Sequence, residues 1–146
     1  MKTLLVPLDF SPATSSVLEE ASRLANALSA EVILMHSTQP PIVTSDYGLA
    51  VENVQEIVAV TEKHAGTQLS HALSTLEQQQ IKTRVHHCHG SAITCIVEYA
   101  KEQDADYIIM GSHGHSAIYD LLIGSTTQGV LKAAPCPVII VPAVKD

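Results

Sequence analysis

Residues 106–114 read DYIIMGSHG, and Gly124 and Ser125 follow after nine further residues. The apolar run at 106–110 has the length and β-branching of a buried parallel strand, and the segment that starts at Ser125 is typical of a helix. A strand, a split glycine loop and a helix amino terminus therefore follow one another. This order indicates a parallel sheet, because parallel strands need a long crossover, usually a helix, between them.

The glycine loop has the features of a phosphate-binding loop. Gly111, Gly114 and Gly124 allow backbone N–H groups to approach an anion, and the first turn of the next helix adds unpaired N–H groups and a positive dipole end. Residues 111–129 contain no lysine or arginine, so this is not a Walker loop, which ends in Gly-Lys-Ser/Thr. We expect the phosphates to be neutralised by amides, by hydroxyls, by His113 or His115, or by a divalent cation.

Two structural explanations of the loop need no ligand. The glycines would then only make turns in a long crossover loop. Ser125, with Gln128 three residues later, would form a capping box at the start of its helix.

Strands and helices alternate along the rest of the chain. Three helices are expected to start at Ser11-Pro12, at Gly90-Ser91 and at Ser125. A fourth, long helix is expected over about 49–80, with a possible break at Gly66. Strands are expected at 3–9, 31–36, 82–89, 106–110 and 136–142. The polar, alternating segment 82–89 is placed at or near a sheet edge. The pattern predicts one α/β domain over residues 1–146, with a doubly wound parallel sheet and helices on both faces.

Composition and charge narrow the function. The chain has 46% hydrophobic residues but no Trp and one Phe, so its core must be aliphatic, as in parallel sheets. A net charge of −7 with only eight scattered Lys and Arg argues against nucleic acid and against anionic membranes as partners. No apolar run approaches the about 20 residues of a membrane span, and no signal segment precedes the first strand. We expect a cytoplasmic protein.

The three cysteines, Cys88, Cys95 and Cys136, form an odd set without CxxC spacing. Such a set suits reduced thiols better than a disulfide framework. The neighbouring run from His86 to His89 suggests a metal site, because imidazole and thiolate bind zinc. Alternation on a strand sends His87 and His89 to one face and His86 and Cys88 to the other, so no specific metal site is expected.

Two strand ends carry unusual chemistry, Asp9 after the first strand and Gly111 after the fourth. In a doubly wound sheet, ligands bind beyond the carboxyl ends of the strands, where the winding direction reverses. If these two strands are neighbours, Asp9 and the glycine loop form two halves of one site. Asp9 could instead remain a solvated carboxylate or cap the first helix.

These residues together resemble the universal stress protein family, in particular its ATP-binding branch. The family pattern is glycine, two residues, glycine, nine residues, then glycine with serine or threonine. Gly111, Gly114, Gly124 and Ser125 match it in full, and residues 6–9 and 136–142 match the first and last strands. The resemblance implies a Rossmann-like fold of the adenine nucleotide alpha hydrolase-like kind, with five parallel strands in the order 3-2-1-4-5.

The resemblance also implies a site, a ligand and an assembly. ATP would bind with Mg²⁺ or Mn²⁺ held by its phosphates, and the expected binding residues are Pro7, Leu8, Asp9, Ser37, Met110, Gly111, His113, Gly114, Gly124, Ser125 and Thr126. Members of this branch often form homodimers by pairing their last strands, here through Val138, Ile139, Ile140 and Val141.

The function expected from these features is a nucleotide-binding stress-response or regulatory protein whose ATP state is read by a protein partner. No catalytic residue is assigned, since the loop offers no fixed cation for phosphoryl transfer. At most we expect slow ATP hydrolysis. The alternatives are an enzyme that hydrolyses ATP or transfers a phosphoryl or nucleotidyl group, and a dimeric interaction module without nucleotide.

Overall fold

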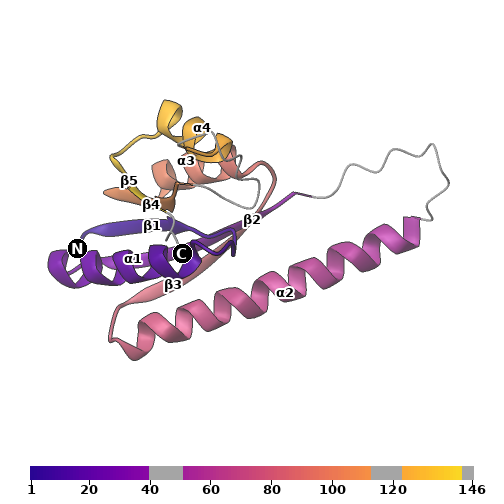
Figure 1. Ribbon diagram of the computed structural model, residues 1–146, viewed down its shortest axis with the longest axis horizontal. Coiled ribbons are helices and arrows are strands. Elements are labelled where there is room, and N and C mark those ends of the chain that lie inside the picture. The colour runs from indigo at the N-terminus through magenta and orange to yellow at the C-terminus, as the bar shows by residue number, and fades with distance from the viewer. Residues whose placement is uncertain (40–50, 113–122, 143–146) are drawn as a thin grey trace.

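The protein is a five-stranded parallel sheet with helices on both faces (Figure 1). A computed structural model describes residues 1–39, 51–112 and 123–142, and it describes the side chains of all of these except 51–55. The strand order is β3-β2-β1-β4-β5, which confirms the α/β prediction and the order implied by the resemblance. All four strand pairings are parallel.

Strands and helices alternate as the sequence predicts. The strands are β1 (Thr3–Pro7), β2 (Glu31–Thr38), β3 (Thr83–His89), β4 (Tyr107–Gly111) and β5 (Val138–Val141). The helices are α1 (Thr14–Leu28), α2 (Val51–Gln78), α3 (Ala92–Glu102) and α4 (Ser125–Ala133). β3 and β5 form the two edges of the sheet, so the prediction of an edge position for the polar third strand is confirmed.

Each face of the sheet has its own aliphatic core. On one face, Leu4, Val6 and Leu34 pack with α1 and α2 residues such as Val17 and Leu76. On the other face, Leu5, Ile33, Met35, Ile108 and Met110 pack with α3 and α4 residues, which are Cys95, Ile96, Ala100 and Val130. The central strands are buried on both faces, which explains their nearly continuous apolar runs.

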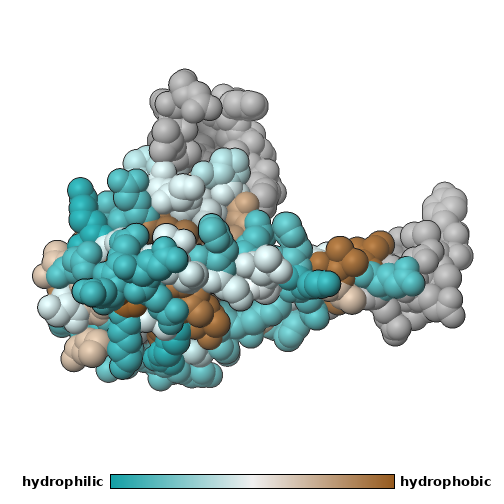
Figure 2. All heavy atoms as spheres, turned by 90° about the horizontal axis from the view of Figure 1, so that it is seen from below, coloured by the Kyte–Doolittle hydropathy of each residue, from teal (hydrophilic) through white to brown (hydrophobic). Residues whose placement is uncertain are grey.

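Helix α2 is longer than the sheet it covers. Its 28 residues span about 42 Å at 1.5 Å per residue, whereas the seven residues of β3 span about 23 Å. Only its carboxyl-terminal part, with Ala65, Leu69 and Leu76, is buried. The amino-terminal part projects beyond the sheet (Figure 1), and Figure 2 shows apolar surface on this projecting part. Its exposed large apolar residues include Ile57 and Val60. Gly66 does not interrupt the helix.

One predicted helix start is wrong in detail, and one predicted cap does not form. α1 begins at Thr14 with Ala13 as its N-cap, not at Ser11-Pro12, because Ser11 belongs to a turn in which its Oγ accepts the N–H of Ala13 at 3.3 Å. α4 has Gly124 as its N-cap and no side-chain cap. Ser125 is therefore the first helical residue, and the capping box with Gln128 does not form.

The expectation of reduced thiols is wrong for two of the three cysteines. Cys88 on β3 and Cys95 on α3 form a disulfide, with Cα atoms 6.3 Å apart, while Cys136 is free. The tight β3–α3 turn brings the two together although their spacing matches no common motif.

Among the described residues, no helix is both long and apolar enough to cross a bilayer.

Candidate functional site

The winding of the sheet reverses between β1 and β4. Leu4 pairs with Tyr107 and Leu5 with Ile108, so the two strands are neighbours, as the sequence hypothesis required. The chain winds from β1 through β2 to β3 on one side and from β4 to β5 on the other. At the carboxyl ends of the central strands lies a cavity of about 310 Å³, which is at the small end of the usual range for ligand pockets.

The end of β1 forms one wall of the cavity. Asp9 is exposed, and its Oδ1 accepts the N–H of Ser11 at 3.0 Å, an Asx turn that fixes the chain between β1 and α1. Phe10, between them, has a φ of 58°, in the left-handed region that non-glycine residues rarely adopt. This turn, rather than a helix cap, explains the local polar residues.

The end of β2 lies beside this turn. Nδ1 of His36 donates a hydrogen bond to the carbonyl oxygen of Leu8 at 2.7 Å, and the N–H of Leu8 donates to Met35 O at 2.7 Å. Phe10 packs on the His36 ring, with centroids 4.8 Å apart. The β1 and β2 ends are therefore fastened together, and Ser37 joins them in lining the cavity.

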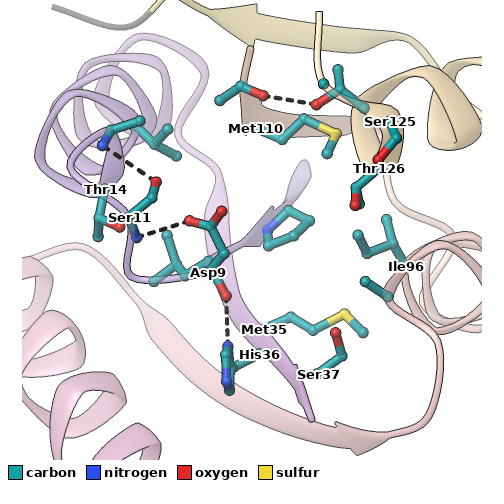
Figure 3. Close-up of a pocket in the computed structure, with 18 residues that line it drawn as sticks. Asp9, Ser11, Thr14, Met35, His36, Ser37, Ile96, Met110, Ser125 and Thr126 are labelled. Carbon is teal, nitrogen blue, oxygen red and sulfur yellow. Dashed lines mark hydrogen bonds between the residues drawn. The ribbon is translucent and has the colours of Figure 1, made fainter. Parts of the chain in front are cut away.

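The opposite wall comes from β4 and the start of α4. Thr127, which is 3% exposed, donates from Oγ1 to Gly111 O at 2.9 Å, and Gly124 N–H donates to Ser112 O at 2.7 Å. The N–H of Gly124 is thus used within the protein. The N–H groups of the first α4 turn have no partner within their helix, and Ser125 and Thr126 of this turn line the cavity across from Asp9 (Figure 3).

The floor and side of the cavity are apolar. Met35 and Met110 come from the sheet, and Ala92 and Ile96 come from the first turns of α3. These side chains offer a flat aromatic group an apolar surface near polar strand ends, a combination common in sites for small molecules.

The structure brings together nine of the eleven residues expected at the site. The cavity is lined by Pro7, Leu8, Asp9, Ser37, Met110, Gly111, Gly124, Ser125 and Thr126. The other two, His113 and Gly114, lie outside the described residues. Sequence reasoning missed the α3 contribution, because nothing in an amphipathic crossover helix marks it as lining a cavity. It also missed His36, although His36 directly precedes Ser37 at the end of a buried run.

The cavity lining is poor in charge. The described residues that line it include no lysine or arginine, and the titratable side chains among them are Asp9 and His36. Within the part of the chain that the structure describes, no three His, Cys, Asp or Glu side chains are arranged to hold a metal ion.

The histidines of β3 divide between its faces. His86 stacks on Tyr99 of α3, with ring centroids 3.7 Å apart. On the other face, Thr38 Oγ1 lies 3.1 Å from His87 Nε2 and 3.3 Å from His89 Nδ1. The predicted alternation is thus confirmed, and the side chains of His86–His89 do not converge on one point.

The fold and the site together define a class, the doubly wound α/β proteins with a cavity where the winding reverses. The comparison with protein families makes this more specific, since the model of the universal stress protein family matches residues 1–142. The chain belongs to that family. The resemblance in the glycine pattern is therefore confirmed.

Relatives match over nearly the whole chain. Universal stress protein A homolog 2 of Coxiella burnetii is 32% identical, over 96% of this chain and 94% of its own. The solved structure of protein MJ0577, from Methanocaldococcus jannaschii, is 27% identical and has a TM-score of 0.84, over 99% of this chain and 98% of that one. The fold is thus shared across the full length.

Two solved relatives are nucleotide complexes. A universal stress protein from Archaeoglobus fulgidus in complex with dAMP is 24% identical, with a TM-score of 0.68 over 97% of this chain and 98% of that one. Another universal stress protein, in complex with cAMP, is 21% identical, with a TM-score of 0.68 over 98% of each chain. At these identities, the likeness concerns the fold alone.

Proposed function

We propose that this protein binds an adenine nucleotide, ATP with Mg²⁺ or Mn²⁺ on its phosphates, and acts as a homodimeric regulatory protein in the stress response. The observation that carries the proposal is the cavity at the winding reversal, which joins the ends of β1, β2 and β4 to the amino terminus of α4. Parallel doubly wound sheets bind nucleotides at this place. The dAMP and cAMP complexes of relatives support the adenine specificity.

Each part of the cavity would have a separate role in binding. Met35, Met110 and Ile96 would contact the base, and Asp9 would accept a hydrogen bond from a ribose hydroxyl. The first-turn N–H groups of α4 and the hydroxyls of Ser125 and Thr126 would meet the phosphates, helped by the helix dipole. His113 and Gly114 would complete the phosphate contacts. Because the described part of the lining holds no lysine or arginine, the divalent cation would neutralise the phosphates.

We propose sensing rather than turnover. Phosphoryl transfer needs cationic groups on the transferring phosphate and a positioned base or water. Among the described side chains that line the cavity, the titratable ones are Asp9 and His36, and none is a lysine or arginine. Hydrolysis would therefore stay well below about 1 s⁻¹, the low end of ordinary enzyme turnover. Steady multiple turnover above that rate would instead establish an ATP-hydrolysing or phosphoryl-transferring enzyme.

Thermal unfolding with Mg-ATP, AMP, cAMP and GTP tests the binding. A ligand at 100 times its Kd stabilises the folded state by about 2.7 kcal/mol, which should raise Tm by roughly 5–10 °C for a chain of this size. We expect this rise with Mg-ATP, a smaller rise with ATP and EDTA, and none with GTP. The absence of any shift with all three adenine nucleotides would refute the proposal.

Gly114→Val tests the glycine loop in the same assay. Its branched side chain should block the approach of backbone to phosphate and abolish the ATP shift while leaving the fold intact. Gly66→Val is the matched control, because a Cβ at Gly66 meets no atom within 4 Å and the site lies elsewhere. An unchanged ATP affinity in Gly114→Val would mean that the phosphates bind outside this loop.

A further inference from the structure

Three pairs of side chains join β3 to α3 in a regular order. Arg84 donates to Gln103 Oε1 at 2.7 Å, His86 stacks on Tyr99, and Cys88 forms the disulfide with Cys95. The strand residues advance by two and the helix residues go back by four, so each pair lies one strand period and about one helical turn from the next. The disulfide is therefore the pair nearest the carboxyl end of the sheet.

The disulfide attaches α3 next to residues that line the proposed nucleotide cavity. Cys95 lies between Ala92 and Ile96 on α3, and both of these residues line the cavity. The intervening turn contains Gly90 at a φ of 132°, and a Cβ at this glycine would lie 3.9 Å from Cys95 Sγ. The covalent bond thus fixes the first turns of α3, the cavity side wall, against the end of β3.

The two cysteines differ in exposure. Cys88 is partly exposed, whereas Cys95 is only 8% exposed. A reagent in solution can therefore reach Cys88 first. The third cysteine, Cys136, lies on the loop before β5, where burial and then the charge of Asp106 raise the pKa of its thiol. A raised pKa leaves less thiolate, so the Cys136 thiol should react slowly in thiol–disulfide exchange.

We propose that Cys88 and Cys95 form a reversible redox pair that controls how tightly the cavity holds its nucleotide, by exchange with a low-molecular-weight thiol–disulfide couple such as glutathione. The inference rests on the proposed nucleotide binding. Disulfides between an accessible and a buried cysteine at the side of a ligand site are suited to regulation, since one sulfur reacts and the other resolves.

The exchange is balanced as follows. In the reduced protein, the Cys88 thiolate attacks glutathione disulfide, forms a mixed disulfide and releases one glutathione. The Cys95 thiol then loses its proton and attacks Cys88 Sγ, which releases the second glutathione. The protein dithiol is oxidised by two electrons and glutathione disulfide is reduced to two thiols. Reduction runs through the same steps in reverse, starting with attack on Cys88 Sγ.

Reduction should loosen the cavity wall without unfolding the helix. Arg84–Gln103 and His86–Tyr99 remain to hold the rest of α3 on β3. Only the first turns, with Ala92 and Ile96, lose their covalent attachment. A wall that must be ordered on binding costs affinity, so the oxidised form should bind nucleotide more tightly, by about tenfold, within the usual range of coupling between sites.

The test uses the full chain carrying Cys136→Ser, so that only the pair titrates. Thiols are counted by alkylation and mass spectrometry across glutathione buffers, and the Kd for Mg-ATP is measured in the oxidised and the reduced protein. We expect two thiols to appear together and Kd to rise about tenfold on reduction. By reciprocity, saturating Mg-ATP should lower the midpoint potential of the pair by about 30 mV, the equivalent of tenfold for two electrons.

Cys88→Ser with Cys95→Ser should reproduce the reduced Kd and remove the redox response, whereas Cys136→Ser alone should bind as the wild type does. Equal Kd values in the two forms, or a pair that glutathione disulfide fails to oxidise, would overturn the proposal. If neither form binds nucleotide, the proposed function fails separately. In that case, hydrogen exchange over residues 91–96 still tests whether reduction loosens the first turns of α3. Equal exchange in the oxidised and reduced forms would refute the redox proposal as well.

Discussion

At the scale of single residues, two glycines inside helices have opposite surroundings. Gly129 in α4 faces Ile93 of α3, and a Cβ built on it would come within 2.9 Å of Ile93 Cγ1 and closer still to Cδ1. Gly66 in α2 has no atom within 4 Å of the same position. One glycine permits close helix packing, and the other is merely tolerated.

The two alanine substitutions should therefore change stability in opposite directions. Gly66→Ala should raise the free energy of unfolding by about 0.5–1 kcal/mol, because glycine is a poor helix former. Gly129→Ala should lower it by about 1 kcal/mol or more, because the overpacking against Ile93 outweighs that gain. Urea unfolding of both variants measures the difference.

Ile93→Val provides the internal check on this pair, since it removes Cδ1, the atom that crowds Gly129. In a double-mutant cycle, Ile93→Val should recover part of the loss caused by Gly129→Ala and leave Gly66→Ala unaffected. Additive energies for Gly129→Ala and Ile93→Val would contradict the packing explanation. The sequence alone does not distinguish the two glycines, because the contact of Gly129 is with Ile93, 129 − 93 = 36 positions away on another helix, whereas Gly66 has no such contact.

At the scale of elements, β3 has one face toward α3 and the other toward α2. On the α2 side, His87 packs near His36 and His89, with ring centroids 5.8 and 5.0 Å away, and Glu62 of α2 lies 3.6 Å from His89 Nδ1. Burial, and then the positive charges that His36 and His89 can carry, lower the pKa of His87, with a smaller effect from His86; Glu62 acts in the opposite direction.

This lowered pKa makes stability depend on pH. As pH falls below about 6.5, the ordinary value, the unfolded chain binds a proton at His87 before the folded chain does. The free energy of unfolding therefore falls with decreasing pH, until the pH passes below the folded-state pKa. His87→Gln should reduce the slope of stability against pH between 7 and 5, measured by urea unfolding.

The comparison variant is His64→Gln, an exposed histidine on the same helix as Glu62. It should leave the slope as in the wild type. A slope that His87→Gln leaves unchanged would mean that other groups cause the acid sensitivity. NMR titration of the His87 ring gives an independent measure of its pKa.

The elements themselves could be predicted because periodicity and β-branching are local. The alternation on β3 placed His87 and His89 together and His86 and Cys88 together. What lies opposite each face could not be predicted, since it depends on how α2 and α3 cross the sheet. For this reason the sequence suggested reduced thiols, whereas the β3–α3 turn joins Cys88 to Cys95.

At the scale of the whole molecule, the site combines segments about 100 residues apart. Asp9 and Gly111 were recognised as strand ends, and the family pattern supplied the strand order that makes them neighbours. The α3 wall, with Ala92 and Ile96, required the three-dimensional packing. The turn at Asp9 and Ser11 also looked like a helix start in the sequence, because Asp and Ser serve both structures.

The edge strand β5 has a hydrogen-bonding side with no partner strand in the described part of the chain. Ile108 N–H donates to Pro137 O, and Ser112 N–H donates to Val141 O. Residues alternate along a strand, so Ile139 and Val141 turn toward β4 while Val138 and Ile140 turn their N–H groups to the outer edge. Such an edge invites pairing with another strand. A second copy of β5 is the partner that we propose.

Ile140→Pro should weaken this homodimer and spare the fold. Proline removes the outward N–H of Ile140 but none of the hydrogen bonds to β4, and edge strands tolerate it. Loss of one hydrogen bond per protomer, at about 1 kcal/mol each, should raise the dimer Kd roughly 30-fold. Ile140→Val keeps the N–H and most of the side chain, so it should remain dimeric. Sedimentation equilibrium compares the wild type, Ile140→Pro and Ile140→Val. A wild type that is monomeric at tens of micromolar, or an Ile140→Pro variant that dimerises as tightly as the wild type, would exclude pairing through β5.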